Sequence, residues 1–420
     1  MRSPDQEKPI SSEQEAPEQK HVDRRAWLAS AVSAMGVTAA GLIAPSLLPA
    51  AEQNDTDPTR VPGRIPSPYG TRALGETAQR LTTATHSLTP HQSLHGIITP
   101  SALHFERHHN GVPAIDTDRH RLLIHGLVER PLVFSMADLT RFPSVTRMLF
   151  IECSGNSGKE WKGQTGKTVQ ETHGLMSTSE WTGVLLATVL AEAGIKQEAA
   201  WVLAEGSDAA AMTRSLPLAE VLKDALLCYA QNGEALRPEQ GYPLRLVIPG
   251  WEGNTCIKWL RRLKLGTAPF MTREETSRYT DLMPDGTARQ FTFVMEAKSV
   301  ITTPSGGQQI EPGFIEIRGL AWSGRGLVKT VEVSIDGGRT WRPAHIQGPV
   351  LPQCHTRFRF GWQWNGGETI LQSRCIDDSG YVQPARVALV AARGIHSSYH
   401  YNAIQSWKVA ADGKVTNVQV

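Results

Sequence analysis

A cysteine at the start of a loop of small residues is the strongest candidate for chemistry in this sequence. Cys153 follows a largely apolar run at 146–152 and lies in the segment 152–158, which reads ECSGNSG. Small residues let backbone amides approach a bound group closely. A thiolate at this place is a soft ligand for a transition metal, whereas a lone cysteine is more often a small buried apolar residue. This segment alone leaves both interpretations open.

Two further clusters place cations beside small or apolar residues. Arg107 and His109 are two positions apart, so they share one face of an extended segment, and arginine binds oxyanions through a rigid fork of donors. In the stretch 241–259, a short apolar strand carries Arg245, ends in a Gly-rich loop and is followed by Lys258. Such a loop can cradle a phosphate. A solvated polar loop around His109 and an Arg245 whose charge reaches the strand edge are the structural alternatives.

Composition and cysteine spacing exclude several other kinds of chemistry. The chain has 420 residues, with 43 Lys and Arg against 41 Asp and Glu, so the formal net charge is +2. A balance this close to neutral gives no reason to expect a nucleic-acid partner. The 5 cysteines include no C-x-x-C pair and no C-x-x-C-H motif, which excludes paired-cysteine zinc sites, thioredoxin-like motifs and covalent c-type haem in this chain. An odd number leaves at least one thiol without an intramolecular partner.

The N-terminal segment 1–51 predicts export. The pair Arg24-Arg25 precedes an uncharged run rich in Ala, Ser and Gly, which ends in Ala50-Ala51. A basic region, a modestly apolar stretch and small residues at the end form a secretory signal, and the paired arginines indicate the twin-arginine type. We therefore expect a periplasmic protein that is exported folded, with a transmembrane anchor as the alternative. In that oxidising compartment a free thiol needs burial or a ligand.

The mature chain divides into an extended arm at 52–90, a mixed α+β part at 91–290 and a β-rich part at 291–420. In the mixed part, apolar runs predict helices at 181–193 and 217–230 and strands at 121–126, 146–152 and 244–249. In the last part, apolar and polar residues alternate at 330–335 and 357–364, and further strands fit 314–320, 370–376 and 386–390. Alternation with frequent turns is typical of an antiparallel β-sandwich with one buried face per sheet.

Taken together and in this order, the three clusters resemble the sulfite oxidase family of molybdenum enzymes. The family's E-C-x-G-N loop is present at 152–156, and its R-x-H pair matches 107–109. Its G-Y-P-x-R, P-G-x-x-G and K-W stretches are present at 241–245, 249–253 and 258–259. The resemblance covers about 90–420. It implies an α+β molybdopterin-binding domain followed by an all-β, Ig-like dimerisation domain, with molybdenum and a pyranopterin as cofactor.

The resemblance also implies roles for individual residues. Cys153 matches the protein's one thiolate ligand to molybdenum, and Arg107 and Tyr279 match its catalytic partners. The other cysteines are then expected to be core thiols, with a Cys354–Cys375 bridge left open. The positions that match the family's cofactor-binding residues are Arg107, His109, Cys153, Ser154, Asp208, Gln240, Arg245, Thr255 and Lys258.

Two departures from the family pattern bear on the substrate. Ser157-Gly158, followed by Lys159, stands where typical sulfite oxidases carry an arginine that helps to bind sulfite, and Gln240 stands where a histidine is common. The loss of a pocket cation argues against the small sulfite dianion. The pattern resembles the sulfane dehydrogenase branch of the family, in the periplasmic Sox thiosulfate-oxidation system. This branch oxidises a sulfane sulfur held on a cysteine of a carrier protein, with oxygen from water.

The resemblance implies partners as well. Because this chain has no haem motif, we expect its electrons to pass to a dihaem c-type cytochrome subunit. Self-association through the C-terminal domain would give a heterotetramer of two plus two subunits, with no nucleic acid and no membrane. Two alternatives stay open: a periplasmic sulfite dehydrogenase, and an exported Ig-like binding protein without a cofactor.

Overall fold

The computed structural model describes residues 57–420, so the predicted signal at 1–51 lies outside the described residues. Residues 57–72 contain one short element, the 3-10 helix η1 (Pro58–Arg60). Residues 73–420 form one compact unit. Within the described part of the chain, no helix is long and apolar enough to cross a membrane.

The first half of the compact unit is built on two larger sheets and one small one. One sheet has the antiparallel order β11-β10-β7-β6, with β12 paired to β10. The second has the order β5-β4-β13-β8-β9, in which β13 runs parallel to β4. The strands are β4 (Leu122–Gly126), β5 (Leu132–Phe134), β6 (Ser144–Glu152), β7 (Met176–Leu185), β8 (Trp201–Gly206), β9 (Thr213–Pro217), β10 (Leu226–Gln231), β11 (Glu234–Ala235), β12 (Arg245–Val247) and β13 (Leu260–Gly266).

Short elements connect and cover these sheets. β1 (Leu81–Thr82), β2 (His86–Leu88) and β3 (Glu106–Arg107) form the small sheet, and β14 (Asp281–Leu282) pairs with β15 (Ala288–Arg289). The helices are α2 (Met136–Leu139), α3 (Val169–His173), α4 (Leu186–Ala193), α5 (Leu218–Asp224), α6 (Arg273–Ser277) and α7 (Arg386–Arg393). The remaining 3-10 turns are η2 (His91–Ser93), η3 (Ser101–Leu103), η4 (Gly158–Lys162), η5 (Pro238–Gln240) and η6 (Gly253–Thr255).

Both predicted helices are half wrong. The first part of 181–193 is the end of β7, and α4 begins only at Leu186 before ending at Gly194. The second prediction, 217–230, covers α5 and then β10. Leu226 and Leu227 of β10 pair with both β7 and β12 and are fully buried. A strand buried on both faces is a continuous apolar run, which periodicity does not separate from a buried helix.

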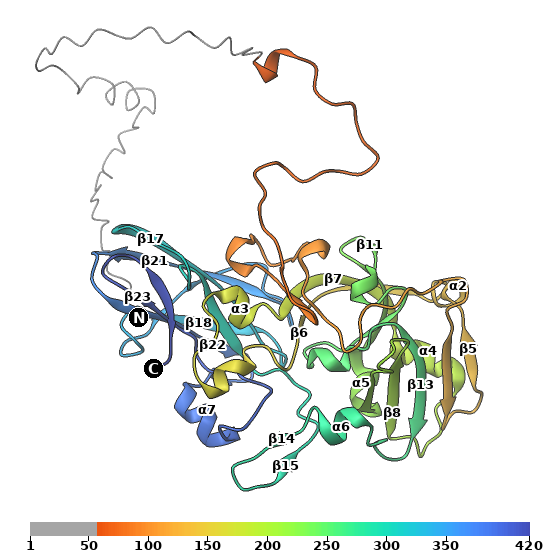
Figure 1. Ribbon diagram of the computed structural model, residues 1–420. Coiled ribbons are helices and arrows are strands. Elements are labelled where there is room, and N and C mark those ends of the chain that lie inside the picture. The colour runs from red at the N-terminus through yellow and green to blue at the C-terminus, as the bar shows by residue number, and fades with distance from the viewer. Residues whose placement is uncertain (1–56) are drawn as a thin grey trace, which may run out of the picture. The chain divides into compact units, whose positions relative to one another are not determined.

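The second half of the unit is the predicted β-sandwich (Figure 1). One sheet has the order β16-β17-β21-β20 and the other β19-β18-β22-β23-β24. Their bounds are β16 (Lys298–Thr303), β17 (Gly313–Trp322), β18 (Val328–Ser334), β19 (Arg342–Pro343), β20 (His345–Gln347), β21 (Thr356–Trp364), β22 (Thr369–Asp377), β23 (Ser406–Val409) and β24 (Val415–Val418).

The alternation along β21 is confirmed, whereas the strand predicted at 386–390 is wrong. In β21, Phe358 and Trp362 are buried while Arg359 is exposed. Residues 386–393 form α7, in which Leu389 and Arg393 are buried four positions apart. That spacing belongs to one face of a helix, and a window of five residues is too short to reveal it.

The hydrophobic core of the sandwich extends into the first half of the unit. Phe150 of β6, Val169 of α3 and Met176 of β7 belong to the same buried cluster as the sandwich residues Trp322 and Phe358. Figure 1 shows β6 and α3 beside the sandwich strands. The end of β6, where Cys153 follows, is therefore packed between the two halves.

All five cysteines lie in the described residues, and all are free thiols. The Cys354–Cys375 bridge that the sequence left open is not formed. Cys228, Cys256, Cys354 and Cys375 are buried, as expected for core thiols, whereas Cys153 is partly exposed.

Candidate active site

A cavity lies next to Cys153. Its walls come from residues 105–109 around β3, the loop after β6, the loop after β8, the 240–259 stretch and the segment after α6. Most of the site residues predicted from the sequence line it: Arg107, His109, Cys153, Asp208, Gln240, Arg245, Lys258 and Tyr279. Segments that are far apart in the sequence therefore converge on one thiol.

The loop after β6 holds Cys153 through its backbone. The Cys153 N–H donates to the Leu175 carbonyl at 2.9 Å, and the Cys153 carbonyl accepts from the Asn156 N–H at 2.8 Å. Gly253 packs against the start of this loop, where a Cβ would lie only 2.9 Å from the Glu152 carbonyl oxygen. A glycine at 253 thus permits the close approach of two backbones beside the thiol. Burial raises the pKa of the Cys153 thiol, so a cation nearby is needed to favour its thiolate.

Arg107, His109 and Tyr279 lie together at the more open side of the cavity. The Tyr279 hydroxyl and His109 Nε2 are 3.0 Å apart, within hydrogen-bond distance. Burial and the charge of Arg107 lower the pKa of His109, and burial raises the pKa of Tyr279. At neutral pH the pair is therefore an uncharged imidazole and a protonated phenol. Arg107, which is exposed, provides the fixed positive charge beside them.

Gln240 and Arg245 form a fixed, buried pair in the cavity wall. Arg245 Nη1 donates to the Gln240 carbonyl at 3.1 Å and to Gln240 Oε1 at 3.0 Å. Gln240 Nε2 donates to the Phe105 carbonyl at 2.8 Å. The Arg245 Nε is buried and has no hydrogen-bond partner within the described residues. A buried guanidinium with a free donor in a cavity wall is suited to an anionic ligand.

Asp208 and Lys258 complete the polar wall. Asp208 is buried, and its Oδ1 accepts from the Met212 N–H at 2.9 Å, so its other oxygen remains available. Lys258 Nζ donates to the Arg107 and Glu239 carbonyls at 3.1 and 3.2 Å and lies 2.7 Å from His108 Nδ1. Burial, together with the charge of Arg245, lowers the pKa of this ammonium group. Lys258 thus links the R-x-H segment to the 241–259 stretch.

Ser154 and Thr255 are buried beside the cavity but do not line it. The Ser154 hydroxyl accepts from Asn254 Nδ2 at 3.0 Å, and the Thr255 hydroxyl donates to the Glu252 carbonyl at 2.7 Å. Both side chains fix the loops on which the cavity residues stand. Their proposed contact with a cofactor stays a prediction.

A buried charged group behind Tyr279 was missed by the sequence analysis. Arg214 is fully buried and bridges Glu252 at 3.1 Å and Glu275 at 3.0 Å. Its guanidinium lies over the Tyr279 ring, 5.0 Å from the centroid. Burial acts to raise the pKa of Glu252, but the Arg214 charge and the hydrogen bond from His400 outweigh it and hold that pKa at about 2. The carboxylate is therefore ionised at neutral pH.

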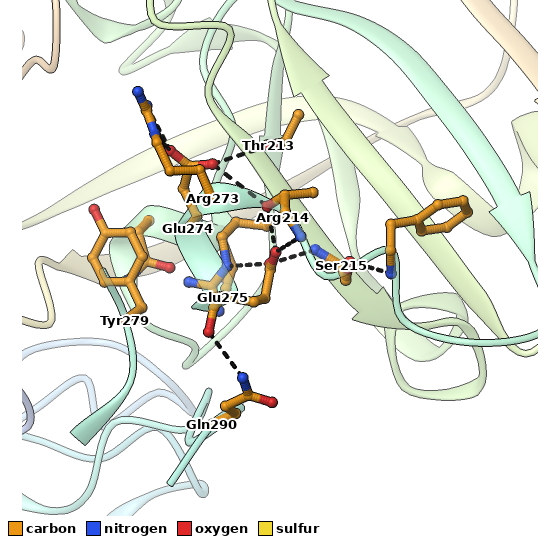
Figure 2. Close-up of polar contacts among 12 residues, drawn as sticks. Thr213, Arg214, Ser215, Arg273, Glu274, Glu275, Tyr279 and Gln290 are labelled. Atoms are coloured by element: carbon orange, nitrogen blue, oxygen red, sulfur yellow. Dashed lines mark hydrogen bonds and ion pairs between the residues drawn. The ribbon is translucent and has the colours of Figure 1, made fainter. Parts of the chain in front are cut away.

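Helix α6 fastens this group to β9. Figure 2 shows Glu274 and Glu275 of α6 reaching back to residues 213–215. Glu275 Oε1 accepts from the Ser215 N–H at 2.8 Å, and Glu274 Oε2 accepts from the Thr213 hydroxyl at 3.1 Å. The Tyr279 N–H donates to the Glu274 carbonyl at 2.8 Å, directly after the helix. No motif marks these residues in the sequence, because their partners are about 60 positions apart and are joined only by folding.

Comparison with known proteins decides the family. An oxidoreductase molybdopterin binding domain is matched at residues 109–274, and a Mo-co oxidoreductase dimerisation domain at 289–407. Chicken sulfite oxidase is 32% identical over 332 residues, covering 72% of this chain and 71% of the chicken protein. The chain belongs to the sulfite oxidase family of molybdenum oxidoreductases.

Two further relatives place the chain within this family. Rat mitochondrial sulfite oxidase is 33% identical over 72% of this chain, and the match spans 60% of the rat protein's length. The crystal structure of the sulfane dehydrogenase SoxCD from Paracoccus pantotrophus contains a chain that is 45% identical, with a TM-score of 0.84. That match covers 90% of this chain and 100% of the solved chain. The fold expected from the resemblance, an α+β molybdopterin-binding domain before a β-rich dimerisation domain, is confirmed.

The residues present fit a molybdenum–pyranopterin cofactor. A free thiol suits the soft metal, and the unpartnered Nε of Arg245 suits the pterin's phosphate. The Asp208 carboxylate suits the donor groups of the pterin ring.

Proposed function

We propose that this chain is the molybdenum subunit of a sulfane dehydrogenase, which oxidises a sulfane sulfur carried on a cysteine of a carrier protein. The observation that carries the proposal is the loop after Cys153. Ser157 is buried there, and its hydroxyl donates to the Thr172 carbonyl at 2.8 Å and accepts from Lys298 at 3.1 Å. Neither Ser157 nor Lys159 lines the cavity. The loop therefore adds no cation for a small dianion such as sulfite.

The reaction balances with water as the source of oxygen. A persulfide R–S–S⁻ and three water molecules give R–S–SO₃⁻, six protons and six electrons. When bound, molybdenum supplies oxygen-atom transfer to sulfur and accepts electrons in pairs. Because this chain has no haem motif, the electrons leave through a c-type cytochrome subunit. The 45% identity to a SoxCD chain supports this division of labour.

The chain's own residues supply binding and orientation. Cys153 holds the metal, while Arg245, Gln240, Asp208 and Lys258 hold the pterin and its phosphate. Arg107 attracts the anionic sulfur at the open side of the cavity. The hydrogen bond between Tyr279 and the neutral His109 keeps a proton beside the reacting sulfur.

The same proposal extends to location and assembly. The twin-arginine pattern at 24–25 supports export of the folded, cofactor-loaded protein to the periplasm. The dimerisation domain at 289–407 supports self-association. Two such chains with two dihaem cytochrome subunits form a heterotetramer in this proposal.

The test compares two substrates on the purified protein with its cytochrome partner. Molybdenum content is measured first, and then cytochrome c reduction with free sulfite and with carrier-bound thiosulfate or persulfide. We expect turnover of the carrier-bound sulfur and slow turnover of sulfite. Fast turnover of free sulfite alone identifies a sulfite dehydrogenase, the alternative that the 33% identity to rat sulfite oxidase favours. Protein without molybdenum would end both enzyme assignments and leave the exported Ig-like binding protein.

A further inference from the structure

The residue before the metal-binding cysteine is held from the dimerisation domain. Glu152 has no exposed surface, and its Oε2 accepts from Trp322 Nε1 at 2.6 Å. Its Oε1 accepts from Lys298 Nζ at 3.1 Å and from Asn156 Nδ2 at 2.8 Å. Lys298 and Trp322 face each other at the paired ends of β16 and β17. The carboxylate therefore receives two of its three side-chain donors from the sandwich.

Lys298 joins both ends of the turn that contains Cys153. Its ammonium is 1% exposed, and besides Glu152 it donates to the Ser157 hydroxyl at 3.1 Å. Lysine is almost never buried to this extent unless it is paired. Glu152 and Ser157 stand on either side of Cys153, with four residues, 153–156, between them. One buried cation thus closes the loop around the thiol.

A second part of the dimerisation domain follows the same loop. The His400 N–H donates to the Ser154 carbonyl at 2.8 Å. A Cβ added at Gly158 would lie 2.5 Å from the Ser398 carbonyl oxygen, so the backbones are in close contact there. The segment 398–400 therefore covers the loop on which Cys153 stands.

We propose that Lys298 and Trp322 are positioning residues that lock the metal-binding loop and so hold the Cys153 thiolate in place for molybdenum. The dimerisation domain then has a role in cofactor retention as well as in self-association. This inference rests on the proposed function, because it takes Cys153 as the metal ligand. It needs no change in the fold of the sandwich itself.

The test measures how freely the loop moves in the full-length protein. Cys153 is the partly exposed thiol, and the other four cysteines are buried, so iodoacetamide labels Cys153 selectively in cofactor-free protein. Trp322→Phe removes one hydrogen bond to the loop, and Lys298→Met removes two. The matched control is Trp407→Phe, because Trp407 is also fully buried in the sandwich but donates to the Ile301 carbonyl at 3.0 Å.

We expect the Cys153 labelling rate, followed by peptide mass spectrometry, to rise about tenfold in Trp322→Phe and Lys298→Met, which corresponds to about 1.4 kcal/mol of loop stabilisation. In Trp407→Phe the rate stays at the wild-type value. In the loaded protein, the first two variants lose molybdenum faster than the control on incubation with a chelator. Equal labelling rates in folded Trp322→Phe, Lys298→Met and Trp407→Phe would overturn the proposal.

If a variant unfolds globally, iodoacetamide labels the buried Cys228 as well as Cys153, and this distinguishes unfolding from movement of the loop alone. If Lys298→Met unfolds globally, Glu152→Gln provides the second test. This substitution keeps the shape of the side chain and weakens the hydrogen bonds from Lys298 and Trp322. Selective labelling of Cys153 in Glu152→Gln supports the proposal, and a wild-type rate refutes it. Wild-type protein without molybdenum would refute the proposed function, while the labelling comparison would still decide whether the loop is locked.

Discussion

Four buried histidines make the folded protein sensitive to acid. His91, His104, His173 and His355 are each at most 1% exposed, and each has an Nε2 without a partner in the described residues. Burial, reinforced by the charge of Arg357, lowers the pKa of His91 to about 3. Burial also lowers the pKa of His104 to about 3 and moves those of His173 and His355 well below the ordinary range. At neutral pH all four are uncharged in the folded state.

The size of the effect follows from proton linkage. In the unfolded chain His91 titrates near its ordinary pKa of 6.5, whereas in the folded state it stays neutral down to about 3. Between these values the unfolded state binds a proton that the folded state does not, so stability is complete above pH 6.5 and falls as the pH falls. At pH 5 the loss is RT ln(1 + 10^1.5), about 2 kcal/mol for this one residue, against about 0.2 kcal/mol at pH 7.

His91→Phe isolates this contribution. Phenylalanine keeps an aromatic ring at this position and removes the titrating group. Acidification from pH 7 to pH 5 lowers the free energy of unfolding of both proteins, and we expect the loss in His91→Phe to be about 2 kcal/mol smaller than the loss in the wild type. Urea unfolding of cofactor-free protein, followed by tryptophan fluorescence at both pH values, measures the difference. His345→Phe is the control, because His345 is exposed and solvated before and after unfolding. The reasoning is refuted if His91→Phe and the wild type lose the same stability on acidification.

Three substitutions test the site itself. Cys153→Ser should keep the circular dichroism spectrum and lose molybdenum and cytochrome c reduction, and retained turnover would show that the ligand assignment is wrong. Arg214→Met should lower the free energy of unfolding in urea by about 3–5 kcal/mol, because two buried carboxylates lose their partner; a loss under about 1 kcal/mol contradicts a buried ion pair. Tyr279→Phe should lower kcat about tenfold at unchanged molybdenum content, through loss of the bond to His109, and an unchanged kcat would remove Tyr279 from the mechanism.

Several cavity residues could be predicted because each belongs to a local motif, whereas Asp208 and Tyr279 were expected only from the family resemblance. Arg107 and His109, Cys153, and the pair Arg245 and Lys258 each stand in a short stretch whose residue types already indicate metal, oxyanion or phosphate chemistry. The β-sandwich could also be predicted from the sequence, because the alternation of apolar and polar residues along a half-buried strand is a local property. What the sequence could not provide was the orientation of each residue, such as the hydrogen bonds that engage Lys258 with His108 and the backbone.

The helices that were predicted wrongly have a cause that is not local. Residues 181–185 and 226–230 lie in β7 and β10, which pair with neighbours on both sides in the middle of a sheet. Their strand structure is therefore set by partners that are distant in the sequence rather than by their own pattern. The same holds for Arg214, whose carboxylate partners lie 38 and 61 positions away.

The pairing of Glu152 shows why such distant partners concentrate at the loop that carries Cys153. An ionised carboxylate next to a thiolate disfavours the thiolate, and Glu152 does act to raise the pKa of the Cys153 thiol. Lys298, 146 positions away, and Trp322, 170 positions away, supply a positive charge and a strong donor to that carboxylate. The glutamate can then serve as a rigid anchor for the loop while its charge is offset. A lysine at the start of one sandwich strand and a tryptophan at the end of the next carry no such meaning locally, so this part of the site becomes visible only when β6 packs against the sandwich.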